Sequence, residues 1–291
     1  MKKIALILLF LCSAGWLHAR TVDVSTTYAG ASHFNQVQAR ATMALTLNTL
    51  AGLEAKIADE RAFKKPVYSV GLPLSLNFEF VQLVFRPFYY FKNKSNNDAF
   101  QDASAFGLNT QVRVTMTDDE VNDIYTHAFL GASFARQKGT VFYENSPYEN
   151  RYYSQTAYML GISQTLFNAF GLDVQATAFQ YPDGISGVAG LRSVMDQQDL
   201  ARTQTLDITH QLTKYTLGGR LSRMWESNAS TLYLSYRYGE YYRADAEHSV
   251  ILGNSFNLFR RVSVDMAYNH VRTIHNQNKR DIFYIQLETS F

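Results

Sequence analysis

The sequence predicts an all-β chain folded as a transmembrane, antiparallel up-and-down β-barrel of about fourteen strands. Two observations support this class. First, apolar and polar residues alternate with a period of two along most of the chain, as in 106–116, 172–178 and 283–291, which is typical of strands with two different faces. Second, short connections alternate with long ones, as expected for hairpins that turn tightly at one rim of a barrel and loosely at the other.

The strand count follows from the connections. The expected short turns lie at 48–51, 79–82, 118–122, 167–170, 226–229 and 258–261, and the longer loops lie at 33–37, 62–66, 93–103, 138–149, 183–200, 242–246 and 274–279. These connections imply fourteen strands. Twelve strands is the alternative, because 20–34 could be a periplasmic arm and a turn at 212–214 would shift the count. In the fourteen-strand reading, 203–224 is one long strand with a slip of register near Lys214. Pro73 and Pro87 fall inside adjacent predicted strands, where a shared bulge would accommodate them.

Residues 1–19 predict a secretory signal peptide. Lys2 and Lys3 form a positive start, Ile4 to Leu11 form a short apolar segment, and Ala19 is a plausible cleavage position. The segment is too short and wrongly flanked for a membrane-spanning helix. The remainder, 20–291, is expected to form a single barrel domain.

Removal of this segment changes the net charge and the cysteine content of the chain. The full chain carries 27 Lys and Arg, 25 Asp and Glu and a single Cys. Lys2, Lys3 and Cys12 all belong to the signal segment, so the exported chain has a net charge near zero and no thiol. The balance excludes a basic surface for nucleic acid, and the missing thiols exclude a disulfide scaffold.

If the apolar face meets lipid, the other face lines the lumen of the barrel. Acidic residues are expected near the short turns and basic residues a little further along the strands, as an acidic ring beneath a basic belt. The candidates that line the lumen are Glu54, Lys56, Glu79, Arg86, Arg113, Asp173, Arg220, Arg237, Asp265 and Glu288. Such charges could set ion selectivity, or they could pair across strands and stabilise the wall.

Aromatic residues gather near both ends of the predicted strands. Phe88, Tyr89, Tyr90 and Phe91 lie near a long loop, whereas Phe167, Phe170 and Trp225 lie near short turns. Two aromatic belts separated by Leu, Val and Ala are typical of the two interfaces of a membrane.

The chain resembles bacterial outer-membrane β-barrel proteins of the porin-like class, with no particular family recognised. The most specific element is the C-terminal strand, in which Phe283, Ile285, Leu287 and the final Phe291 alternate with polar residues. The resemblance implies an outer-membrane location, contact with outer-membrane lipids, and recognition of this strand by the barrel-assembly machinery. A monomer is expected.

The function predicted from the sequence is a passive pore for small hydrophilic solutes. The alternatives are a closed barrel with a structural, adhesive or assembly role and, third, a lipid-modifying membrane enzyme, which would need a His near an acid or Ser at the membrane-facing rim. The enzyme reading is not favoured, because no catalytic set is evident among the six His residues of the exported chain. No metal site and no cofactor are predicted. A soluble periplasmic β-sandwich or closed β-barrel is the runner-up for the fold.

Overall fold

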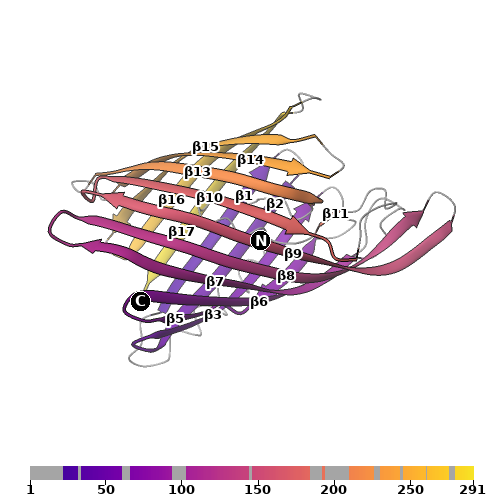
Figure 1. Cartoon of the computed structure of the whole chain (residues 1–291), viewed down its shortest axis with the longest axis horizontal. Coiled ribbons are helices and arrows are strands. Elements are labelled where there is room, and N and C mark those ends of the chain that lie inside the picture. Colours follow the sequence, from indigo (N-terminus) through magenta and orange to yellow (C-terminus); the bar gives the residue numbers. More distant parts are fainter. Residues whose placement is uncertain are drawn as a thin grey trace.

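The computed structural model is an antiparallel barrel whose strands run obliquely around a common axis (Figure 1). It describes residues 22–31, 34–60, 66–93, 103–143, 146–183, 192–193, 210–225, 230–242, 245–259, 261–274 and 279–291. The signal peptide expected at 1–19 lies outside the described residues. Within the described residues, no helix is long and apolar enough to cross a membrane.

Fourteen strands form the closed wall, as predicted. They are β1 (Val22–Ala31), β2 (Phe34–Thr46), β3 (Thr49–Glu60), β4 (Val67–Gly71) with β5 (Leu74–Asn77), β6 (Val81–Asn93), β7 (Ala103–Asp119), β8 (Ile124–Tyr143), β9 (Ser146–Leu166), β10 (Phe170–Gln180), β13 (Thr213–Trp225), β14 (Ser230–Tyr241), β15 (Glu247–Phe259), β16 (Val262–Thr273) and β17 (Lys279–Ser290).

Closure is made by β1, which pairs with β2 on one side and with β17 on the other. Segment 20–34 therefore contributes a wall strand from Val22 onward rather than a periplasmic arm. At the end of the chain, the Phe291 amide donates to the Val22 carbonyl at 2.9 Å, and the Val22 amide donates back at 3.3 Å. The seam thus continues the ladder to the last residue, so the described strands of the wall leave no open edge.

Two prolines lie in adjacent wall strands, Pro73 between β4 and β5 and Pro87 within β6, and the register between these strands is unchanged. Pro73 separates β4 from β5, yet Gly71 pairs with Phe88 and Leu74 pairs with Phe85, three residues further along each strand. The prediction of a shared bulge is therefore wrong. The Leu72 amide still donates to the Pro87 carbonyl at 3.0 Å, so each proline removes only the donor that its own ring lacks.

The described tight turns, at 47–48, 78–80, 120–123 and 167–169, lie at or beside the predicted short turns. At one tight turn, Phe167 and Asn168 adopt φ values of 54° and 46°, the left-handed conformation that suits a hairpin turn. Two expected long loops are wrong. Residues 34–37 of the expected loop 33–37 belong to β2, which pairs Phe34 with Ala31 of β1. The expected loop 138–149 is mostly strand, because β8 runs to Tyr143 and β9 begins at Ser146. The resulting β8–β9 hairpin projects beyond the rim (Figure 1).

The long segment after β10 is described only in part. Its backbone pairs β11 (Arg192–Ser193) with β12 (His210–Gln211) as a small separate sheet. The slip of register expected near Lys214 is confirmed, because the pairing of β13 with β14 shifts between Thr213 and Tyr215. The single strand expected over 203–224 is shorter, since β13 begins at Thr213; residues 203–209 lie outside the described residues.

Candidate functional site: the inner wall

The two faces of the barrel wall differ in exposure and in chemistry. On β10, the side chains of Gln175 and Thr177 are buried, whereas Leu172 and Val174 are 45% and 48% exposed. The opposite wall of a closed barrel shields inward-facing side chains, so we assign the buried face to the inside. The exposed face is apolar on most strands, with Leu130, Leu160, Leu221, Leu234, Leu252, Phe283 and Ile285 among its most exposed residues.

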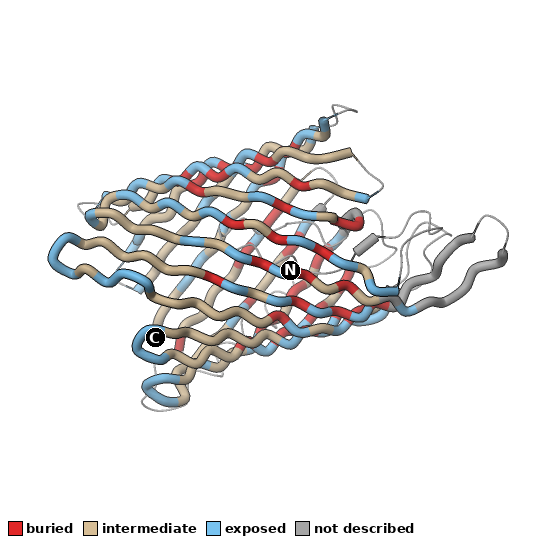
Figure 2. Tube along the Cα trace, viewed as in Figure 1, coloured by how far each residue is buried: buried red, intermediate tan, exposed pale blue. Residues whose placement is uncertain are grey.

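The inner wall changes character along the barrel axis. Buried residues are concentrated toward the long-loop rim, while residues near the short turns are partly or fully exposed (Figure 2). In the shielded half, an apolar cluster includes Phe88, Tyr90 and Ile282. The Phe88 and Tyr90 rings meet edge to face, with centroids 5.8 Å apart, so their burial and their contact together fix both side chains.

This cluster corrects the expected aromatic belt. Successive residues of a strand point to opposite faces, so only Tyr89 and Phe91, 43% and 46% exposed, lie on the outer face. Phe88 and Tyr90 point inward and are 6% and 1% exposed. The sequence shows four adjacent aromatics, and strand parity divides them equally between a membrane interface and the lumen.

The half of the inner wall near the short turns carries most of the predicted charges, and opposite charges are interleaved there. Glu54 on β3 forms an ion pair with Arg86 on β6 across β4. Gly71 is the β4 residue opposite both Glu54 and Phe88, and a Cβ added there would be in ordinary van der Waals contact with Arg86 Nε, at 3.6 Å. Acids and bases therefore do not form the separate layers that the sequence predicts.

A second charged group spans β10 to β16. Arg220 lies directly opposite Asp173 in the ladder, and its guanidinium carbon lies 3.8 Å from the ring centroid of Tyr233. The Tyr233 hydroxyl donates to Asp265 Oδ1 at 2.8 Å. Tyr233 thus links a predicted base to a predicted acid, and strand parity alone gave no reason to select it.

Arg113 and its neighbours form a third group near the short turns. The Arg113 guanidinium carbon lies 5.3 Å from the Phe129 ring centroid, and Asp173 is close enough to attract Arg113 electrostatically. His127, two residues from Phe129 on the same face, lies 3.2 Å from the Thr115 hydroxyl through Nδ1. This group places a cation on β7, an imidazole on β8 and an acid on β10 on the inner wall near the short turns.

The remaining predicted residues occupy other positions in the ladder. Lys56 is buried on β3, opposite Gln38 and Ser69. Arg237 on β14 is opposite Gly218 and Ser249. Glu288 on β17 is exposed, opposite Ser25 and Ser263, and Glu79 is exposed in the short turn between β5 and β6.

The outer rim contains a histidine beside an acid. His270 Nδ1 lies 2.7 Å from Asp281 Oδ1, and the Tyr268 hydroxyl donates to the same oxygen at 2.6 Å. The residues directly opposite His270 are Val250 and Asp281, and neither carries a hydroxyl or thiol that the imidazole could activate as a nucleophile. Among the described residues, no group of three or more His, Cys, Asp or Glu has the arrangement of a metal site.

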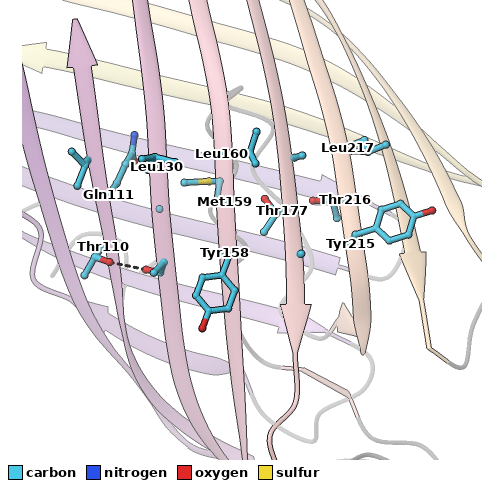
Figure 3. Close-up of a pocket in the computed structure, with 15 residues that line it drawn as sticks. Thr110, Gln111, Leu130, Tyr158, Met159, Leu160, Thr177, Tyr215, Thr216 and Leu217 are labelled. Carbon is cyan, nitrogen blue, oxygen red and sulfur yellow. Dashed lines mark hydrogen bonds between the residues drawn. The ribbon is translucent and has the colours of Figure 1, made fainter.

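A hollow of about 610 Å³ lies on the outer wall across β7, β8, β9, β10 and β13 (Figure 3). Small residues such as Ala132 and Ala178 are flanked in the ladder by Tyr158 and Tyr215, which are 52% and 36% exposed. The hollow forms because small and aromatic side chains alternate on this surface. The exposure of the two tyrosines shows that it faces outward rather than into the lumen.

Comparison with known proteins gives a fold but no family. No family model and no curated protein matches the chain. Solved structures that it resembles include CdiB from Acinetobacter baumannii (TM-score 0.53, 9% identity, covering 94% of this chain and 60% of that one). They also include the Pseudomonas putida toluene transporter TodX (0.51, 8%, covering 94% and 89%) and Pseudomonas putida OprB (0.50, 7%, covering 94% of each).

These likenesses agree with the closed barrel, which is the fold of outer-membrane β-barrel channels. At identities of 7–9%, these similarities show only that the chain shares the fold. The chain spans 60% of the length of CdiB, so it corresponds to only part of that protein.

Proposed function

We propose that this protein is an outer-membrane channel, a passive pore for small hydrophilic solutes. The observation that carries the proposal is the opposite chemistry of the two faces of a closed fourteen-stranded wall. The outer face is apolar, as contact with lipid requires, and the inner face near the short turns carries charged and polar side chains. Barrels of this size enclose more space than strand-borne side chains alone fill.

The pairing of opposite charges on the inner wall predicts a pore that discriminates only weakly between cations and anions. Glu54 is paired with Arg86, and Arg220 lies opposite Asp173, so the field of each cation is partly cancelled by a neighbouring acid. Small uncharged solutes and small ions of either sign are therefore the expected cargo. Channel-forming neighbours such as the toluene transporter TodX support the channel role, but the polar inner wall favours a different solute class here.

Planar-bilayer recording on the purified, folded chain tests the proposal. Discrete conductance steps are expected with the folded protein and not with the same preparation after heat unfolding. Protein that is folded by heat-modifiable gel migration yet gives no steps above the lipid background would contradict the pore.

A second candidate is a closed barrel with a structural role, and the shielded half of the inner wall favours it. Tyr90, Gln137, Gln155 and Ile282 are at most 2% exposed. Substituting Tyr90→Ala and Phe88→Ala separates the candidates. If the apolar cluster closes an otherwise continuous lumen, the double variant conducts where the wild type does not; a wild type that already conducts excludes the closed barrel.

We also propose that the chain is a monomer inserted among outer-membrane lipids, and that the barrel-assembly machinery recognises β17. Phe283, Ile285 and Leu287 are outward and exposed, and Phe291 is 69% exposed. Membrane fractionation tests the location. Deleting Phe291 should slow appearance of the folded, heat-modifiable form; an unchanged rate would exclude a signal at this residue.

A further inference from the structure

Three basic residues lie side by side on the outer face of the barrel at the long-loop rim. His248 on β15 is directly opposite Arg272 on β16, and Arg272 is directly opposite Lys279 on β17. Residues paired in this way have Cβ atoms only about 5 Å apart. The register therefore gathers three potential cations from three strands into one short row.

The burial pattern places the row on the outside. On β15, Ser249 and Ile251 are buried, whereas Val250 and Leu252, of the same parity as His248, are 42% and 53% exposed. Arg272 and Lys279 are themselves exposed. These side chains thus face the surroundings of the barrel rather than its lumen.

The outer face below the row changes in two steps toward the membrane interior. The first row down contains His270 and Asp281, and Tyr268 of the next row donates its hydroxyl to Asp281. That next row also contains Phe283, whose ring centroid lies 5.3 Å from that of Tyr268. From the middle of the barrel toward the long-loop rim, the outer face therefore carries apolar residues, then aromatic residues, then cations. This order matches the hydrocarbon, interface and headgroup layers of a membrane.

The acid nearest the row is already engaged. Asp281 Oδ1 accepts from Tyr268 and lies 2.7 Å from His270 Nδ1, while Asp281 attracts Lys279 electrostatically. Among the residues that the structure describes, no ion pair joins Arg272 or Lys279 to an acid. Like charges directly opposite each other destabilise a ladder, so a bound anion would relieve their repulsion.

We propose that His248, Arg272 and Lys279 bind the phosphate of an anionic lipid headgroup in the leaflet at the long-loop rim. The guanidinium offers paired donors to phosphate and the ammonium adds a point charge. Tyr236 bonds to His248 Nδ1 and holds the imidazole beside them. The acyl chains of the same lipid would lie along the exposed Val250, Leu252 and Phe283. The proposal requires a barrel in a membrane but not an open pore.

Lipid retention measured by native mass spectrometry tests this. The folded full chain is titrated with dioleoyl phosphatidic acid and with dioleoylglycerol, which differ only in the phosphate. Retention of phosphatidic acid should exceed that of dioleoylglycerol. Arg272→Gln should weaken it about fivefold, the value expected for one basic residue at an anionic membrane surface, and Arg272→Lys should restore most of it.

Arg136→Gln is the matched control. Arg136 is also an exposed outer-face cation near the long-loop rim, but it lies opposite Phe106 and Ser154 and over the ring of Tyr152. It should retain phosphatidic acid as the wild type does. Equal losses in the two variants, or no preference for phosphatidic acid, would overturn the proposal.

A competition experiment with inorganic phosphate and a replacement variant complete the test. If inorganic phosphate competes as effectively as phosphatidic acid, the row binds a free anion and the lipid assignment is wrong. If Arg272→Gln fails the gel test for folding, Lys279→Gln at the first residue of β17 replaces it with the same expected direction.

Discussion

Tyr233 on β14 reaches across β15 and donates its hydroxyl to Asp265 on β16 at 2.8 Å. The ring crosses β15 at Gly253, the residue directly opposite Tyr233 in the ladder. On its other side, Arg220 of β13 lies 3.8 Å from the ring centroid. One aromatic side chain therefore ties four neighbouring strands together on the inner wall.

Gly253 is the position on which this arrangement depends. A Cβ added there would lie 2.2–2.6 Å from three atoms of the Tyr233 side chain, so Gly253→Ala must displace the ring and its hydrogen bond. We expect a loss of about 1–3 kcal/mol in the free energy of unfolding, measured by denaturant unfolding in vesicles. Gly218→Ala is the matched control on the same face, because its Cβ would meet nothing closer than 3.7 Å. Equal losses in both variants would show that Tyr233 does not depend on Gly253.

The ion pair of Glu54 and Arg86 should be strongly coupled. Their side chains are 6% and 20% exposed, so removing either partner leaves a shielded charge. Glu54→Gln and Arg86→Gln should each cost about 3–5 kcal/mol, and the double variant should cost clearly less than their sum. A double-mutant cycle on unfolding free energies measures the coupling; strictly additive losses would mean that the pair contributes nothing to the wall.

Arg113 should influence ion selectivity if the lumen conducts. Arg113→Gln removes a positive charge near the short-turn rim, where Asp173 remains. The cation-to-anion permeability ratio, obtained from reversal potentials in a salt gradient, should rise about two- to fivefold, since a charge a few ångströms away in water contributes up to about 1 kcal/mol. The outer-face variant Arg136→Gln should leave the ratio unchanged. A ratio that responds to Arg136 and not to Arg113 would place the ion path elsewhere.

Asp119 should titrate at unusually low pH. It lies at the end of β7, a strand of 17 residues, beyond the 9–11 residues that a membrane strand requires. Hydrogen bonds from the Asn122 side chain, at 2.8 Å, and from the Asn122 and Val121 amides, each at 3.1 Å, lower the pKa of this carboxyl.

A depressed pKa fixes the sign of the effect on stability. These bonds stabilise the turn fully above the pKa of the unfolded chain, and their contribution is lost as pH falls through the folded pKa. Asn122→Ala should move the pKa of Asp119 back toward its ordinary value, as measured by NMR titration. If Asp119 titrates identically in the variant, the Asn122 side chain is not a cause of its lowered pKa.

The parts of the fold that the sequence predicts correctly are those that a membrane imposes locally. Lipid requires one apolar face, so Leu172 and Val174 alternate with Asp173 and Gln175 and mark β10 as a strand. Tight hairpins require residues that tolerate a left-handed backbone, so Asn168 marks a turn. The loop expected at 138–149 is wrong because the alternation weakens there, whereas the ladder still pairs Val141 with Glu149.

The inner wall was predictable only in part. Parity selected Glu54, Arg86, Arg220 and Asp265 because charges stand out against an apolar face. It gave no reason to select Tyr233 or Gly253, since an aromatic and a glycine are common on either face of a strand. Nearness to a long loop, rather than parity, assigned Phe88 and Tyr90 to a membrane belt, although they are buried inside.

By itself, the sequence determined an all-β barrel of fourteen strands, because a period of two and the spacing of turns are properties of neighbouring residues. Only the tertiary structure decided which charges meet, which aromatics enter the lumen, and that His248, Arg272 and Lys279 share one row. Those contacts join residues on different strands, and the register between strands fixes them.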